Sequence, residues 1–213
     1  MRIAITVPPS AAPRSGNRHT AGRWRGFLRD FGHRVRVVTE WTGGNDELLL
    51  ALHAYKSRPS VERFHRLKPG APIVDALTGT DLYRDIRRYA AARRSLGTTA
   101  RLAVLQEEGL RELRPALRRK ARAVHQSSDV RLRHEPCRSR FRGAVLGHLR
   151  REKYPFRAVR ALRRLDRAAR VEVVQVGGAL DAGMRAEARS WSKREPRYRW
   201  LGSVPHGLAM RWL

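Results

Sequence analysis

Residues 2–7 read Arg-Ile-Ala-Ile-Thr-Val and are followed by Pro8 and Pro9, and this stretch decides the fold class. A short apolar run rich in β-branched residues is typical of a buried strand. The two prolines end it, because proline cannot donate a backbone hydrogen bond to a neighbouring strand. We therefore expect a sheet whose first strand is this stretch.

The following sequence alternates helix and strand. Trp24, Phe27, Leu28 and Phe31 recur at helical spacing, and Gly32 is placed to end that helix as a C-cap. Further strands are expected at residues 35–39, 48–53, 72–77, 102–105 and 121–125, and helices at 59–67, 81–96 and 107–113. Such alternation predicts a parallel sheet with right-handed crossovers, whose ligands bind beyond the carboxyl ends of the strands.

A polar, charged segment at residues 127–140 interrupts this pattern and is interpreted as a linker. The alternation then restarts, with strands expected at 143–146, 171–176 and 198–201 and helices at 155–165, 181–192 and after Pro205. The predicted organisation is α/β with two Rossmann-like domains, at 1–126 and 141–213. The second domain has only three expected strands, fewer than a free-standing domain usually has, and its last helix has no C-cap. We therefore expect the second domain to be truncated.

The composition excludes several classes of protein. The 213 residues include 46 Lys+Arg and 19 Asp+Glu, a net charge of +27, and only five of the basic residues are lysines. Because the arginines run through every segment instead of one tail or helix, no specific nucleic-acid partner is expected. The single cysteine, Cys137, excludes a disulfide framework. No apolar run suits a signal peptide or a membrane span, so we expect a cytoplasmic protein.

The first candidate site is the loop at residues 13–18, Pro-Arg-Ser-Gly-Asn-Arg, between the first strand and its helix. Gly16 permits close approach of backbone to a ligand, and the helix start offers unpaired N–H groups to an anion. Arg18 and Arg23 add positive charge. A flexible connector would account for the same residues.

The second candidate site lies after the third and fourth strands. His53 ends the third strand, where a histidine can act as donor or base, although a lone histidine is more often structural. Residues 77–85 read Leu-Thr-Gly-Thr-Asp-Leu-Tyr-Arg-Asp. Thr80 or Asp81 can cap the next helix. Capping alone would not require the whole set of Thr78, Gly79, Asp81, Tyr83 and Arg84.

The third candidate site opens the second domain. Residues 146–156 read Leu-Gly-His-Leu-Arg-Arg-Glu-Lys-Tyr-Pro-Phe, a strand end at a glycine followed by a basic loop. Lys153 and a neighbouring arginine can neutralise a diphosphate. The alternative is a solvated basic loop. No histidine or carboxylate cluster has metal-ligand spacing, so no metal or cofactor is expected.

Several of these strings resemble a known family. The glycine loops and the Gly-x-x-x-x-Glu-Lys pattern are similar to glycosyltransferase family 4, which has the GT-B fold. Over almost the whole chain, the resemblance is to the selenosugar synthases of selenoneine biosynthesis. It rests on residues 17–24, 52–54, 77–86, 125–127, 147–157 and 196–202, of which Thr-Gly-Thr-Asp-Leu-Tyr-Arg-Asp and Gly-His-Leu-Arg-x-Glu-Lys are the most specific strings.

The resemblance implies a UDP-sugar donor, expected to be UDP-N-acetylglucosamine, and selenophosphate as acceptor, with a 1-seleno sugar as product. The donor would bind mainly to the second domain and the acceptor to the first. The implied roles are His53 and Asp81 as catalytic residues; Gly16, His148, Arg150 and Lys153 at the donor diphosphate; and Asn17, Arg18, Arg23, Thr78, Thr80 and Arg84 at the acceptor. Other family members have an arginine where His148 stands, and Arg150 would then supply that charge.

One departure from the family pattern bears on activity. Family members carry a Glu-x7-Glu-like segment later in the second domain, and the sequence stops before it. We therefore expect little or no turnover from these 213 residues. Two other functions stay open: a family 4 glycosyltransferase with an ordinary hydroxyl acceptor, and a basic nucleic-acid-binding protein.

Overall fold

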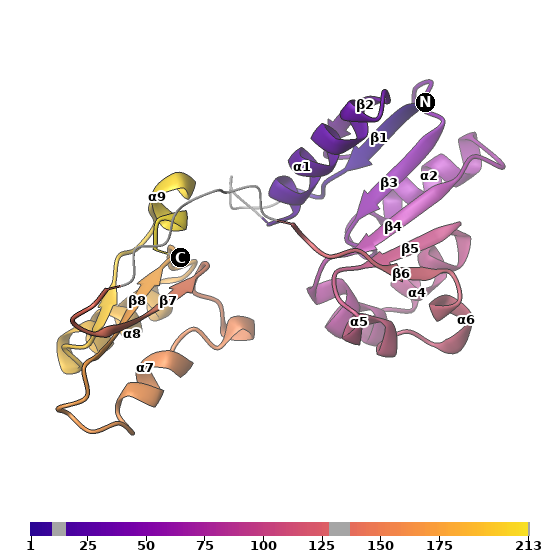
Figure 1. The fold of residues 1–213 in the computed structure, drawn as a ribbon. Coiled ribbons are helices and arrows are strands. Elements are labelled where there is room, and N and C mark those ends of the chain that lie inside the picture. Colours follow the sequence, from indigo (N-terminus) through magenta and orange to yellow (C-terminus); the bar gives the residue numbers. More distant parts are fainter. Residues whose placement is uncertain (10–15, 128–136, 213) are drawn as a thin grey trace. The chain divides into compact units, whose positions relative to one another are not determined.

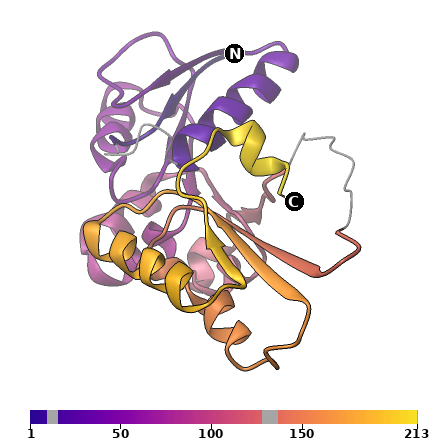
Figure 2. The same cartoon turned by 90° about the vertical axis from the view of Figure 1, so that its left-hand side faces the viewer.

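The structure is a computed structural model that describes residues 1–9, 16–127 and 137–212. It divides into two compact units, Met1–Ser127 and Ser128–Leu213. Each unit is built on a sheet of its own (Figures 1 and 2). Most of the expected linker at 127–140 lies outside the described residues. Within the described residues, no helix is both long and apolar enough to cross a bilayer.

The first unit contains a six-stranded sheet in the order β2-β1-β3-β4-β5-β6. Every neighbouring pair is parallel, which confirms the predicted sheet. The strands are β1 (Arg2–Thr6), β2 (Arg34–Val38), β3 (Leu48–Leu52), β4 (Ile73–Leu77), β5 (Arg101–Val104) and β6 (Ala121–Ala123). Each matches one of the strands expected in this part of the sequence.

Helices cover both faces of this sheet. Ala21 of α1 (Gly16–Asp30) packs with Ile3 and Ile5 of β1. Phe64 of α2 (Arg58–Leu67) packs instead with Ala4. Because successive side chains of a strand point to opposite faces, α1 and α2 lie on opposite sides of the sheet (Figure 1).

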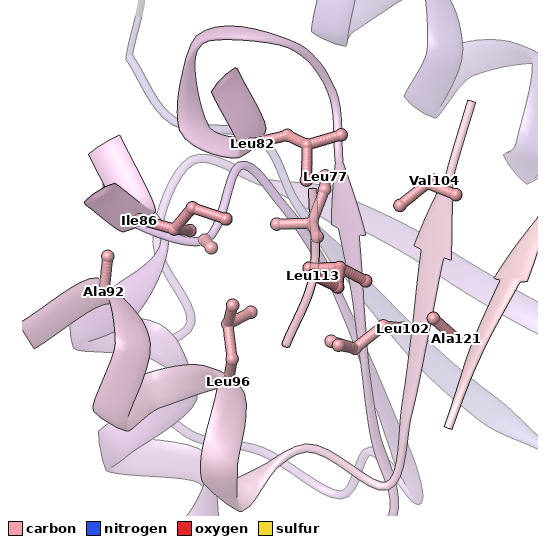
Figure 3. Packing of buried hydrophobic residues seen from close by; sticks show 10 residues of the cluster. Leu77, Leu82, Ile86, Ala92, Leu96, Leu102, Val104, Leu113 and Ala121 are labelled. Atoms are coloured by element: carbon pink, nitrogen blue, oxygen red, sulfur yellow. The ribbon is translucent and has the colours of Figure 1, made fainter. Parts of the chain in front are cut away.

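A third core lies over β4 and β5. Leu77 and Leu102 are buried there against Leu82, Leu96 and Leu113, which come from the segments after these strands (Figure 3). The short helices α5 (Glu108–Arg111) and α6 (Pro115–Arg118) connect β5 to β6. The sequence did not predict α6.

The prediction of one continuous helix at 81–96 is wrong. A π-helical turn spans Asp81–Asp85, α3 spans Ile86–Arg88, and α4 spans Ala90–Thr98. The chain is extended at Tyr89, with φ −114° and ψ 115°. The Tyr89 ring stacks on Tyr55, 4.2 Å between centroids. That long-range contact, which helical periodicity does not encode, accompanies the break.

The second unit repeats the pattern on a smaller scale. Its sheet has the order β7-β8-β9 and is also parallel, as expected. Asp181 caps α8 by accepting a hydrogen bond from the backbone N–H of Met184 at 2.7 Å. The elements are β7 (Phe141–Leu146), α7 (Arg157–Leu162), β8 (Val171–Val176), α8 (Ala182–Arg194), β9 (Tyr198–Trp200) and α9 (His206–Met210).

One strand of the first unit buries an acid. Asp75 of β4 is inaccessible to solvent, and neither of its carboxylate oxygens has a hydrogen bond to a described residue. Burial raises the pKa of Asp75 well above its usual value, and the charge of Asp81 raises it further. Folding therefore favours the protonated form of this side chain.

We expect Asp75→Asn to change how stability depends on pH. In the native protein the raised pKa of Asp75 lowers the free energy of unfolding as pH rises above about 4, by about 1.4 kcal/mol per pH unit until the raised pKa is reached. The neutral amide does not titrate. Urea denaturation from pH 4 to 8 should show the variant gaining stability relative to the native protein as pH rises, and parallel pH profiles would contradict this.

Candidate functional site

Two strand ends of the first unit meet around a buried histidine. His53 follows β3, which pairs with β4, and the backbone N–H of His53 bonds to the carbonyl of Ala76 at 2.9 Å. Its φ is +78°, a left-handed conformation that is unusual for a side chain of this size. The residue is only 4% exposed. Local strain of this kind often accompanies functional sites.

The carboxylate of Asp81 holds the two strand ends together. Its Oδ2 accepts the backbone N–H groups of Ala54 at 3.1 Å and Thr78 at 3.2 Å, and its Oδ1 accepts that of Gly79 at 2.8 Å. Asp81 is inaccessible to solvent. The carboxylate of Asp81, expected to be catalytic, thus accepts three backbone N–H groups, and it fixes the loop that carries Thr78 and Thr80.

His53 is a neutral donor in this arrangement. Its Nδ1 lies 3.4 Å from the donating backbone N–H of Lys56, so the proton sits on Nε2, 3.1 Å from the Thr80 hydroxyl oxygen. Burial lowers the pKa of His53, while the charges of Asp81 and Asp85 partly oppose that effect. In this tautomer the neutral imidazole donates through Nε2, because Nδ1 already accepts the backbone N–H of Lys56.

Asp85 belongs to this site and was missed as a candidate residue. One of its oxygens, Oδ1, accepts a hydrogen bond from Nε of Arg84 at 2.8 Å. The other, Oδ2, is buried 3.7 Å from Nε2 of His53 and has no hydrogen-bond partner among the described residues. The sequence signal was the spacing of four between Asp81 and Asp85, which puts two acids on the same side of a helical turn.

The other predicted residues of the first unit lie on α1. Gly16, Asn17 and Arg18 form the first turn of that helix and not a loop, and residues 13–15 lie outside the described residues. The side chain of Arg23 bonds to the hydroxyl and the carbonyl oxygen of Ser127. The structure thus brings His53, Thr78, Thr80, Asp81 and Arg84 together, while Arg23 binds the segment after β6.

Two glycines meet at the carboxyl ends of β7 and β8. A Cβ atom on Gly177 would lie 1.9 Å from the carbonyl oxygen of Gly147, so only glycine permits this approach. Both residues have positive φ, +148° and +145°. Leu149 then donates its backbone N–H to the carbonyl of Gly178 at 3.0 Å. The loop after β7 is thereby held against the loop after β8.

The predicted basic residues surround this pair of glycines. Nζ of Lys153 lies 3.2 Å from the position that a Cβ on Gly147 would occupy, so the ammonium group folds over the glycine turn. Nδ1 of His148 is buried without a hydrogen bond to a described residue and lies beside Gly178. Arg150 immediately precedes the short 3₁₀ turn that carries Lys153. This arrangement is suited to an anion approaching the strand ends.

The described residues contain no group of three or more His, Cys, Asp or Glu side chains that could hold a metal ion.

Comparison with known proteins gives structural matches alone. No family model and no curated protein matches the sequence. HepE of Anabaena, solved with UDP and glucose, is 14% identical, with all of this chain and 71% of HepE covered at a TM-score of 0.61. The UDP-GlcNAc 2-epimerase of Methanocaldococcus jannaschii is 7% identical, and the match covers 100% of this chain and 76% of the epimerase at a TM-score of 0.57. The lipopolysaccharide outer core galactosyltransferase WaaB is 9% identical, and the match covers 98% of this chain and 70% of WaaB at a TM-score of 0.61.

These likenesses show the fold. The α/β architecture with two parallel-sheet units is GT-B-like, as the sequence predicted. At such identities they do not by themselves assign an activity.

The Gly147–Gly177 contact yields a stability prediction. Gly177→Ala must displace backbone and should lower the free energy of unfolding by at least about 3 kcal/mol. Gly202→Ala is the matched control, because Gly202 also has positive φ, +69°, but its Cβ would meet no described atom within 4 Å. The control should lose about 1–2 kcal/mol. If urea denaturation shows the same decrease in the free energy of unfolding for both variants, the packing argument is contradicted.

Proposed function

We propose that the chain is a glycosyltransferase of family 4 that transfers N-acetylglucosamine from UDP-N-acetylglucosamine to selenophosphate. The observation that carries this proposal is the glycine turn after β7 and β8, with Lys153 folded over it. The GT-B-like fold supports it, as does the presence of UDP in the HepE complexes. The selenium acceptor rests on the resemblance of residues 77–86 and 147–157 to selenosugar synthases.

The second unit would hold the diphosphate of the donor. Gly147 carries no side chain, so a phosphoryl oxygen that approaches the strand end there would meet the ammonium group of Lys153, while Gly177 leaves room for the carbonyl of Gly147. Lys153 would neutralise the charge that grows on the leaving diphosphate, with Arg150 and the unpaired Nδ1 of His148 beside it. His148 can donate to a phosphoryl oxygen only in the tautomer that carries the proton on Nδ1.

The first unit would hold the acceptor. His53 offers Nε2–H beside the Thr80 hydroxyl, and Asp81 fixes the loop that presents both threonines. Asp85 lies close enough to His53 to position its ring. Because both nitrogens used by Arg23 point to Ser127, we leave Arg23 out of the proposed acceptor site.

The reaction needs little help from a base. Selenium of selenophosphate is already anionic and forms the new bond to the anomeric carbon, while the bond from that carbon to the diphosphate oxygen breaks. UDP leaves with the bonding electron pair. Water then hydrolyses the selenium–phosphorus bond, which yields the 1-seleno sugar and inorganic phosphate. A hydroxyl acceptor would instead have to lose a proton to a base.

The second candidate function is transfer to an ordinary hydroxyl acceptor. The buried imidazole of His53 favours it, because the lowered pKa keeps the ring neutral near pH 7, and in the tautomer with its proton on Nδ1 the Nε2 atom would accept the hydroxyl proton.

Calorimetric titration with UDP tests the donor site. We expect Lys153→Ala to weaken UDP binding at least tenfold, because the cation over the glycine turn is lost. Lys193→Ala is the matched control: it removes the same charge from the exposed end of α8 and should change the affinity less than twofold. Similar affinities for the Lys153 variant and the native protein would refute the assigned role.

A second experiment tests the acceptor. The protein is incubated in molar excess over UDP-N-acetylglucosamine with selenophosphate, so that even one slow turnover is detected by mass spectrometry. We expect a selenium-containing hexosamine and free UDP. Transfer to hydroxyl compounds with none to selenophosphate would assign the chain to the second candidate function.

A further inference from the structure

A second basic site lies in the second unit, between α7 and α8. A hollow of about 780 Å³ is lined there by Arg151, Arg157, Arg160 and Arg164 with the single acid Glu187. Phe156, Ala161 and Met184 form its apolar lining. Lys153 is not among the lining residues, so this arginine groove is separate from the glycine turn.

The arginines of this groove are only partly used by the fold. Arg160 lies 3.7 Å from the carboxylate of Glu187, and Arg157 lies over the ring of Tyr154, 5.7 Å from its centroid. The side chains of Arg151 and Arg164 make no hydrogen bond or ion pair with any side chain that the structure describes. The lining therefore carries an excess of three positive charges around a concave surface.

A neighbouring hollow shows that charge count alone does not make such a site. It measures about 740 Å³ and is also lined by four arginines and one glutamate. There, however, Arg197 binds Glu195 at 2.9 Å and the carbonyls of Leu162 and Asp166 at 2.7 and 2.8 Å. Arg163 and Arg194 lie over the Trp191 ring. Three of its four arginines, all but Arg167, thus have a described partner, against two of four in the arginine groove, and Arg197 alone makes three such bonds.

The spacing of the groove arginines indicates an extended anion. Arg157 and Arg160 lie three residues apart on one face of α7, Arg164 follows two residues after the end of that helix, and all three line the groove. A single phosphate would reach one or two guanidinium groups. A chain of linked phosphoryl groups can engage all three, and arginine binds phosphoryl oxygens in pairs.

We propose that the arginine groove binds a linear polyphosphate, either free or as the triphosphate of a nucleotide. The apolar lining of Phe156, Ala161 and Met184 leaves room beside the arginines for a nucleoside. The exposed ring of Tyr154, 70% accessible, stands at the rim where a base can stack. This site is independent of the proposed donor site, because the two have no lining side chain in common.

Calorimetric titration with inorganic tripolyphosphate at 150 mM salt tests the proposal. All proteins carry Lys153→Ala, so that the glycine turn contributes nothing and a failure of the proposed function leaves the result intact. We expect Arg157→Gln with Arg164→Gln to weaken binding at least tenfold. The matched control, Arg163→Gln with Arg167→Gln, removes the same charge from the neighbouring hollow. It should weaken tripolyphosphate binding less than twofold.

Circular dichroism confirms that each variant is folded before its affinity is compared. Equal weakening of binding by the two double variants would show diffuse attraction to a basic surface and overturn the proposal. Unchanged binding in both variants would overturn it as well. Titration with ATP distinguishes the sources. Binding tighter than that of tripolyphosphate, and lost in the groove variant, identifies a nucleotide; equal binding, lost in the same variant, identifies the phosphoryl chain alone.

Discussion

Parallel strand pairing is the constraint on which both candidate sites depend. In each unit every described strand runs the same way, so the loops that follow the strands collect along one edge of the sheet. His53 and Asp81, 28 positions apart, meet because β3 pairs with β4. Gly147 and Gly177 meet because β7 pairs with β8 in register. Strand pairing therefore brings the loops together, and residues in the loops, such as Asp81 and Gly177, then fix their conformation.

Buried charge in the first unit is handled in two opposite ways. Asp81 has three backbone N–H donors around its carboxylate, which compensate the loss of water and stiffen the loop after β4. Asp75 has no such donors in the part of the chain that the structure describes, and burial favours its neutral form. His53 lies between these cases, because its ring is buried and neutral but close to two acids. The site combines a fixed loop with a titratable donor.

The large excess of arginine has more than one structural meaning. Arg197 binds an acid and two backbone carbonyls, so it stabilises the packing of the segments around α7 and β9. Arg36 likewise binds the buried Asp46 at 2.5 Å, which raises the pKa of the guanidinium and lowers that of the carboxyl. Arg151 and Arg164 have no such described contacts and face a hollow. Net charge alone does not separate these roles, whereas the partners of each side chain do.

The sequence by itself determined the alternating strands and helices, the parallel sheets and the glycine-rich basic turn near Lys153, because periodicity and turn residues act over a few positions. It identified Thr78, Thr80 and Asp81 as a group but missed Asp85 and the break at Tyr89. Only the tertiary structure decided that Phe31 is 79% exposed although it shares its helical spacing with the partly buried Trp24 and Leu28, and that the carboxylate of Asp81 accepts backbone donors. Burial, hydrogen-bond partners and the Gly147–Gly177 contact depend on segments distant in sequence, which packing alone brings together.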